Sequence, residues 1–261
     1  MTELEQQALI EFVNIVRKLR RECPWDRMQT NRSIRHYTME EVYELVEAID
    51  EEDWKSVKGE LGDLLLNVFL HAQIAEDEGK FSLAEMITEE TKKMIVRHPH
   101  VFADIRADDP EQVKKNWEKI KTGEGRVSLF DGIPKTLPAL ALAFKIQDRA
   151  ARVGFDWKDP EDVWKKVEEE IKELREAVGE GNKAKVEEEL GDLLFAIVNY
   201  SRHILVHPES ALREAAQKFR KRFLYIEKEL AKRNISLHDA TLEQMDALWN
   251  ESKSKDLPND L

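Results

Sequence analysis

Two sets of acidic residues recur along the chain with identical internal spacing. Each set combines a Glu-x-x-Glu pair with a later Glu-x-x-Asp pair, and the second set lies 129 residues after the first. The first set is Glu41, Glu44, Glu60 and Asp63, and the second is Glu170, Glu173, Glu189 and Asp192. Residues three apart share one face of a helix. Two antiparallel helices in each half would therefore bring four carboxylates together.

Converging carboxylates raise one another's pKa unless a cation neutralises them. Ligands that are all oxygens suit Mg²⁺, with Mn²⁺ as a second candidate. A single Glu-x-x-Glu in so acidic a chain would indicate only a solvated helix face. Asp63 and Asp192, however, both stand just before a Leu-Leu pair, and aspartate is unfavourable inside a helix. A di-iron site would require Glu-x-x-His motifs, so the repeat favours a divalent magnesium-type site.

A pair of basic residues and then a tryptophan follow each acidic set. In the first half they are Lys93, Arg97 and Trp117, and in the second they are Lys218, Arg222 and Trp249. A cation alone is more often a surface residue, and a tryptophan alone is often part of a core. Their shared order favours binding of a polyphosphate by the cations and of a base by the indole ring.

Apolar residues recur mainly at helical spacing, and no run of alternating strands is evident. Helices are expected over residues 4–21, 38–49, 54–78, 82–96, 110–121, 139–153, 160–178, 183–206, 209–233 and 242–253. Thr38 and Glu41 form a capping-box pattern at the start of the second of these. The apolar stripe of the third is expected to be Leu61, Leu64, Leu65, Val68 and Phe69. The interpretation is an all-α chain of two tandem helical bundles, residues 1–121 and 139–261, joined by a linker over residues 122–138 that is rich in Gly and Pro.

The composition narrows the class of protein further. A net charge of −12 argues against binding of DNA or RNA as polymers. One cysteine, Cys23, excludes an internal disulfide and fits a reducing compartment. No apolar run is long enough to span a membrane, and the first residues lack a secretory signal pattern. We therefore expect a cytoplasmic protein without membrane contact, whose two bundles pack face to face or mediate a dimer.

Several short motifs, together with the acidic sets, resemble those of the MazG family of nucleoside triphosphate pyrophosphohydrolases, in its two-domain bacterial form. They are Cys23-Pro24-Trp25-Asp26, Arg97-His98-Pro99-His100-Val101-Phe102, Lys145-Ile146-Gln147 and Val153-Gly154-Phe155-Asp156-Trp157. The resemblance spans nearly the whole chain. It implies two tandem MazG-type helical domains, a homodimer and Mg²⁺ dependence. It also implies cleavage of NTPs or dNTPs between the α- and β-phosphates, giving the monophosphate and pyrophosphate, as in house-cleaning or nucleotide-pool control.

The resemblance also assigns roles to residues. The second acidic set would hold the metal, and the first set would do so by its place in the repeat. The nucleotide would be lined by Lys166, Val167, Glu168, Glu169, Glu170, Lys185, Glu187, Glu188, Asp192, Lys218, Phe219, Arg220, Lys221, Arg222 and Trp249, and in the first half by Lys93, Arg97 and Trp117. Apart from the resemblance, we expect a spare carboxylate, Glu169 or Glu40, to orient or deprotonate the attacking water. Ser56 stands where the second half has Lys185, which makes the second site the more complete one.

Two other functions fit the same pattern. A related all-α pyrophosphohydrolase with a narrow substrate, such as dUTP, dCTP or phosphoribosyl-ATP, would use the same acids. A non-catalytic nucleotide-binding interaction module would not need them intact, and their presence in both halves argues against it.

Overall fold

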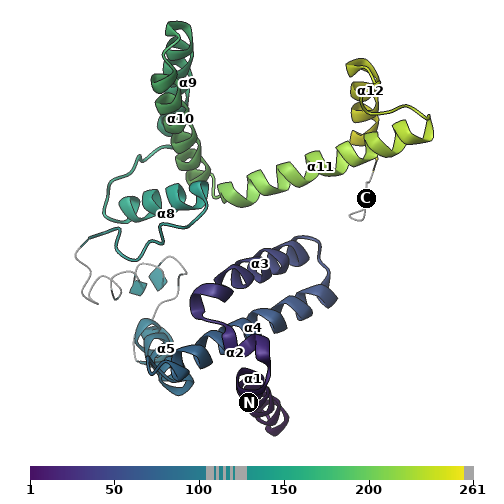
Figure 1. The fold of residues 1–261 in the computed structure, drawn as a ribbon. Helices are drawn as coiled ribbons and strands as arrows, with labels where there is room; N and C mark the ends of the chain where they lie inside the picture. The colour runs from purple at the N-terminus through teal and green to yellow at the C-terminus, as the bar shows by residue number, and fades with distance from the viewer. Residues whose placement is uncertain (104–108, 110–111, 114–115, 118–119, 121–127, 256–261) are drawn as a thin grey trace. The chain divides into compact units, whose positions relative to one another are not determined.

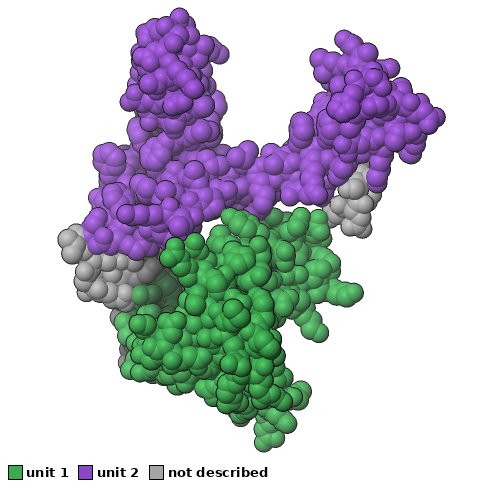
Figure 2. Space-filling view, in the orientation of Figure 1, with its two compact units in different colours: residues 1–120 green, residues 121–261 purple. Residues whose placement is uncertain are grey.

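The structure is a computed structural model that describes residues 1–103, 109, 112–113, 116–117, 120 and 128–255. The chain divides into two compact units, Met1–Ile120 and Lys121–Leu261 (Figure 2). Every regular element in the described ranges is a helix. The predicted all-α fold with tandem helical units is therefore confirmed. The predicted linker over residues 122–138 lies partly outside the described residues and stays a prediction, and most of the helix predicted over residues 110–121 also lies outside them.

The first unit is built on an antiparallel pair of long helices (Figure 1). Its helices are α1 (Glu3–Glu22), α2 (Pro24–Met28), α3 (Asn31–Asp50), α4 (Trp54–Asp77), α5 (Leu83–Arg97) and α6 (Pro99–Phe102). The helices α3 and α4 pair with each other, and α1 and α5 pack against α4. Because α3 and α4 carry the first acidic set, their pairing decides whether those acids meet.

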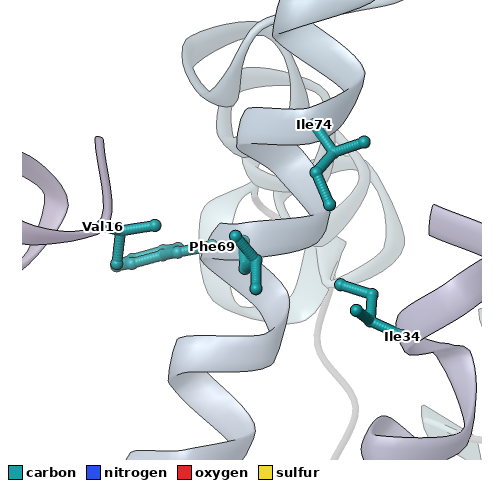
Figure 3. Packing of buried hydrophobic residues seen from close by; sticks show 5 residues of the cluster. Val16, Ile34, Phe69 and Ile74 are labelled. Atoms are coloured by element: carbon teal, nitrogen blue, oxygen red, sulfur yellow. The ribbon is translucent and has the colours of Figure 1, made fainter. Parts of the chain in front are cut away.

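The core of the first unit forms where three helices meet (Figure 3). Val16 comes from α1, Ile34 from α3, and Phe69 and Ile74 from α4, and each of these side chains is buried. The rings of Phe12 and Phe69 also lie 5.7 Å apart. The cluster as a whole packs α1 and α3 against α4.

The start of α3 differs from the prediction. The helix begins at Asn31, and its cap is Thr30, whose hydroxyl accepts a hydrogen bond from the backbone N–H of Ser33. The predicted capping box of Thr38 with Glu41 is wrong, because Thr38 lies inside the helix. Its hydroxyl instead contacts Nε2 of His71 on α4 at 3.0 Å. Thr38 therefore serves a polar contact between two helices and does not cap one.

The second unit contains a second long antiparallel pair. Its helices are α8 (Ala139–Arg152), α9 (Pro160–Glu180), α10 (Lys183–His203), α11 (Pro208–Lys232) and α12 (Leu242–Lys253). The helices α9 and α10 pair along their length, and α8 packs against α10 (Figure 1). The helices α11 and α12 share a separate core of Tyr225, Ile226, Leu230 and Leu248.

Buried polar side chains fix α8 in place. The guanidinium of Arg149 donates to the carbonyl oxygens of Leu129 and Asp131 at 2.8 and 2.7 Å. The amide of Gln147 donates to the carbonyl oxygen of Phe195 on α10 at 2.8 Å. Buried polar groups need such partners, so these contacts bind both the preceding segment and α10 to α8.

Both long hairpins leave an apolar stripe in solvent. On α4, Leu61, Leu65 and Val68 are 52%, 41% and 39% exposed. On α10 the residues 129 positions later are also exposed, namely Leu190, Leu194 and Ile197. Of the predicted apolar stripe of α4, Leu61, Leu65 and Val68 are therefore exposed, whereas Phe69 is buried. Within the described part of the chain, no helix is long and apolar enough to cross a membrane.

Candidate metal centres

The first acidic cluster is formed by the α3–α4 hairpin. Ligand oxygens of Glu41, Glu60 and Asp63 all lie within 4.8 Å of one another. Glu41 comes from α3, and Glu60 and Asp63 come from one face of α4, as their three-residue spacing requires. Glu44 is not part of this group of three, although its charge acts on Glu41.

The carboxylates of this cluster repel one another. Partial burial raises the pKa of Glu41, and the neighbouring carboxylates of Asp63 and Glu44 raise it further. Among the described residues, no ion pair involves Glu41, Glu60 or Asp63. A cation placed among these oxygens would remove the repulsion.

The second cluster repeats this arrangement on α9 and α10. Oxygens of Glu170, Glu173 and Glu189 lie within 4.8 Å of one another. Asp192 falls outside this group but still acts electrostatically on Glu189. Desolvation raises the pKa of Glu189, the charges of Glu173 and Glu170 raise it further, and Lys185 opposes them.

A lysine pairs with one acid of the second cluster. The ammonium of Lys166 is 2.7 Å from Oε1 of Glu170 and 2.9 Å from Oε1 of Glu169. These two hydrogen bonds raise the pKa of Lys166 well above its usual range. The side chain of Glu170 is only 6% exposed, and its other oxygen, Oε2, has no hydrogen-bond partner in the described structure.

Both clusters fit a hard divalent cation. Oxygens bound to one Mg²⁺ at about 2.1 Å are at most about 4.2 Å apart. A spread of 4.8 Å therefore needs only small side-chain movements to close around an ion. The buried Oε2 of Glu170 lacks a hydrogen-bond partner. Burying such an atom unpaired is costly, and a bound cation would remove that cost.

The predicted cations and tryptophans come together as pairs in both units. The guanidinium of Arg222 on α11 lies 5.5 Å from the ring centroid of Trp249 on α12. In the first unit the guanidinium of Arg97 lies 5.8 Å from the ring of Trp117. The ring of Phe219 also packs 5.1 Å from Trp249. In both units the arginine and the tryptophan that follow the acidic set are thus in contact with each other.

The remaining predicted site residues are more scattered. Those exposed on helix surfaces are Glu40, Glu44, Asp63, Lys93, Glu168, Glu169, Glu187, Glu188, Asp192, Lys218 and Arg220. Val167 is buried in the core, and Lys185 pairs with Glu180 at 3.3 Å. Lys93 pairs with Glu90 and lines an apolar hollow of about 680 Å³ with Met94 and Phe102.

Sequence reasoning missed two features. The family resemblance assigned Lys166 to the nucleotide, but its pairing with Glu170 was not predicted, although their four-residue spacing on a helix signals such a pair. Sequence reasoning also missed the contact of Asp156 with Arg202 and His203, whose Nε2 lies 3.0 Å from the Asp156 carboxylate. That contact fixes the segment after α8 to the end of α10, and no sequence spacing reveals it.

Comparison with known proteins gives a consistent result. Residues 29–102 and 158–224 match the family described as the MazG nucleotide pyrophosphohydrolase domain. The chain is 47% identical over 251 residues to a Thermotoga maritima protein named nucleoside triphosphate pyrophosphohydrolase/pyrophosphatase MazG, covering 94% of this chain and 96% of the relative. It is 44% identical over 243 residues to the nucleoside triphosphate pyrophosphohydrolase of Escherichia coli K12, covering 90% and 92%. Each matched segment contains one complete acidic set.

Proposed function

The chain belongs to the MazG nucleotide pyrophosphohydrolase family, and from this premise we propose that it hydrolyses nucleoside triphosphates to the monophosphate and pyrophosphate. The observation that carries the proposal is the repeated carboxylate cluster on the two long hairpins, one with a buried and unpartnered oxygen. We also infer that the enzyme works in the cytoplasm, where its substrates are found.

The cofactor of this reaction is Mg²⁺, which Mn²⁺ can replace. Glu170, Glu173, Glu189 and Asp192 would hold it in the second unit, and Glu41, Glu44, Glu60 and Asp63 in the first. When bound, the ion supplies charge neutralisation on the phosphates and activation of a water. Support comes from the oxygen-only donor sets and from the raised pKa values of Glu41 and Glu189.

The other residues act on the substrate. Glu169, or Glu40 in the first unit, accepts the proton of the attacking water. Lys218 and Arg222 stabilise the charge that develops on the leaving pyrophosphate. Trp249 packs against the base. Its ring is half-buried and lies beside Arg222, which supports this role. Lys93, Arg97 and Trp117 hold the corresponding positions in the first unit.

We further propose that the protein is a homodimer. The exposed stripes on α4 and α10 are apolar at positions i, i+4 and i+7, which is the pattern of a helix face that packs against another helix. Two such hairpins from different copies would form a four-helix bundle.

Product analysis tests the reaction. The full chain is incubated with Mg²⁺ and each common NTP and dNTP, and the products are separated by ion-exchange chromatography. We expect monophosphate and pyrophosphate in equal amounts, and no turnover when EDTA removes the metal. Release of inorganic phosphate with the diphosphate would overturn the assignment. Asp63→Asn and Asp192→Asn, assayed in parallel, identify which unit turns over substrate.

A further inference from the structure

The two acidic clusters differ in the cations beside them. In the second cluster the ammonium of Lys166 contacts one of the clustered acids, Glu170, at 2.7 Å, and the adjacent Glu169 at 2.9 Å. It satisfies one oxygen of Glu170 and leaves the buried Oε2 without a partner. The lysine therefore already balances part of the negative charge to which a divalent cation would bind.

The first cluster has a neutral residue at the corresponding position. Tyr37 stands 129 residues before Lys166. Its ring packs against His36 at 3.9 Å and Trp25 at 6.0 Å. The influences that act most strongly on Glu41 are burial and four other carboxylates. The repeat thus provides an internal comparison: Lys166 and Lys185 stand beside the second cluster where the first has Tyr37 and Ser56. Of the two lysines, Lys166 pairs directly with an acid of the cluster, whereas Lys185 pairs with Glu180.

We propose that Lys166 is a resident counter-ion of the second cluster, and that a divalent cation must displace it from Glu170 in order to bind. This inference rests on the proposed function, because it assumes that the clusters bind a divalent ion. Its consequence is that one chain has two metal sites of unequal affinity. The first cluster binds the ion strongly on its own, and the second binds it weakly until a triphosphate is present.

The physical reason is competition between two cations for the same oxygens. A divalent ion bound to Glu170 repels a neighbouring ammonium, and even at the exposed edge of the protein this repulsion lowers affinity on the order of tenfold. A triphosphate reverses the effect, because its phosphates accept the displaced ammonium of Lys166 on its long flexible stem. Metal and nucleotide then strengthen each other's binding at this cluster, and the coupling is reciprocal.

Direct measurement of Mn²⁺ binding to the full chain, by electron paramagnetic resonance of the free ion, tests this without turnover. We expect one tight and one weak site per chain, with the tight site removed by Asp63→Asn and the weak one by Asp192→Asn. Lys166→Met should tighten the weak site about tenfold. Tyr37→Lys should weaken the tight one to a similar extent.

The matched control is Lys165→Met. Lys165 is the preceding residue, is largely exposed and pairs with Asp162 at 2.9 Å, so its loss changes the net charge equally without touching the cluster. It should leave both affinities unchanged. Circular dichroism confirms that each variant keeps its helices. An α,β-methylene triphosphate, which resists cleavage between the α- and β-phosphates, should tighten the weak Mn²⁺ site more in the wild type than in Lys166→Met. The Mn²⁺ that the triphosphate binds without protein is subtracted first.

The outcomes separate the two proposals. Suppose that Mn²⁺ binds, but that the affinity of the weak site is the same in Lys166→Met and in Lys165→Met. The counter-ion role is then wrong, while the metal-dependent function stands. If both sites bind with equal affinity in the wild type, the role is also wrong. If neither cluster binds Mn²⁺ in any variant, with or without the triphosphate, the metal-dependent function itself fails.

Discussion

The ionised carboxylate of Glu41 is destabilised in the folded protein. Its pKa lies above the ordinary glutamate value of 4.5 because of burial and the nearby carboxylates. The folded state then binds more protons than the unfolded state from about pH 4.5 upward. The free energy of unfolding therefore falls as the pH rises through that window.

Glu41→Gln should remove this cost. Without divalent ions we expect the free energy of unfolding at pH 7 to rise by about 0.5 kcal/mol, a small value because the side chain is partly exposed. Below pH 4 the gain should vanish. With Mg²⁺ the order should reverse, because ligand binding stabilises only the intact cluster. Urea unfolding at both pH values measures this, and equal changes at pH 4 and pH 7 would show that the carboxylate is not strained.

Arg222 has a different role, since its guanidinium lies over Trp249. Arg222→Met keeps the apolar stem and removes the charge. We expect KM for the triphosphate to rise about tenfold, as for loss of one charge-assisted hydrogen bond. Stability should fall by less than about 1 kcal/mol, the usual size of an exposed cation–π contact.

The control for Arg222 is Lys232→Met on the same helix. Lys232 is exposed and pairs with Glu229 at 2.6 Å, so this variant removes the same charge away from the tryptophan. KM should not change in it. A similar rise of KM in both variants would mean that net charge, and not the contact with the nucleotide, controls binding.

At the scale of elements, the turns of the two hairpins share one backbone feature. Gly181 ends α9 with φ +70°, and Glu52, 129 positions earlier, has φ +56° between α3 and α4. The next residue caps the following helix in both, Asn182 in one and Asp53 in the other. The left-handed residue reverses the chain and so sets the register at which the acids meet.

Gly181→Ala should therefore destabilise the second unit by about 1 kcal/mol, because a Cβ disfavours this conformation. Gly179→Ala is the matched control, since Gly179 lies inside α9 and a methyl group added there would meet only open space. Alanine favours helix at that position, so it should stabilise by roughly 0.5–1 kcal/mol. Thermal denaturation followed by circular dichroism compares the two variants. Opposite signs are expected, and a stabilised Gly181→Ala would contradict the role of the turn.

The helices were largely predictable from sequence, but their partners were not. Periodicity placed the long helices within a few residues, except that α3 begins at Asn31 and not at Thr38. Thr38 has the residue type of a helix cap, but its hydroxyl contacts His71 on another helix. Leu61 and Leu65 are apolar at core spacing and are nonetheless exposed. Spacing reveals which side chains share a face, and it does not reveal what covers that face.

For the acidic clusters too, the sequence predicted the residues but not their exact grouping. The repeat predicted eight acidic ligands, and the structure groups three of them in each unit. The groups differ, since Asp63 belongs to the first while its counterpart Asp192 lies outside the second. Side-chain rotamers on exposed helix faces decide this, and spacing along the sequence does not fix them.

At the scale of the whole molecule, the duplication supplies two clusters and two exposed apolar stripes in one chain. Leu190 directly follows the acidic residue Glu189, just as Leu61 follows Glu60. Each stripe therefore begins next to a candidate metal ligand. An interface formed there would also restrict water around the acids and strengthen their interaction with a cation.

The proposed homodimer makes the last prediction. Leu194, 46% exposed in the middle of the α10 stripe, would be buried in such an interface, and Leu194→Glu would bury an unpaired carboxylate. We expect the dissociation constant of the dimer to rise on the order of 100-fold. Size-exclusion chromatography with light scattering should then give the mass of one chain, while circular dichroism stays unchanged. Leu242→Glu is the control, because Leu242 is 74% exposed in the first turn of α12, where an acid suits the helix dipole. A wild type that runs as a monomer, or a Leu194→Glu variant that stays dimeric, would contradict an interface on this stripe.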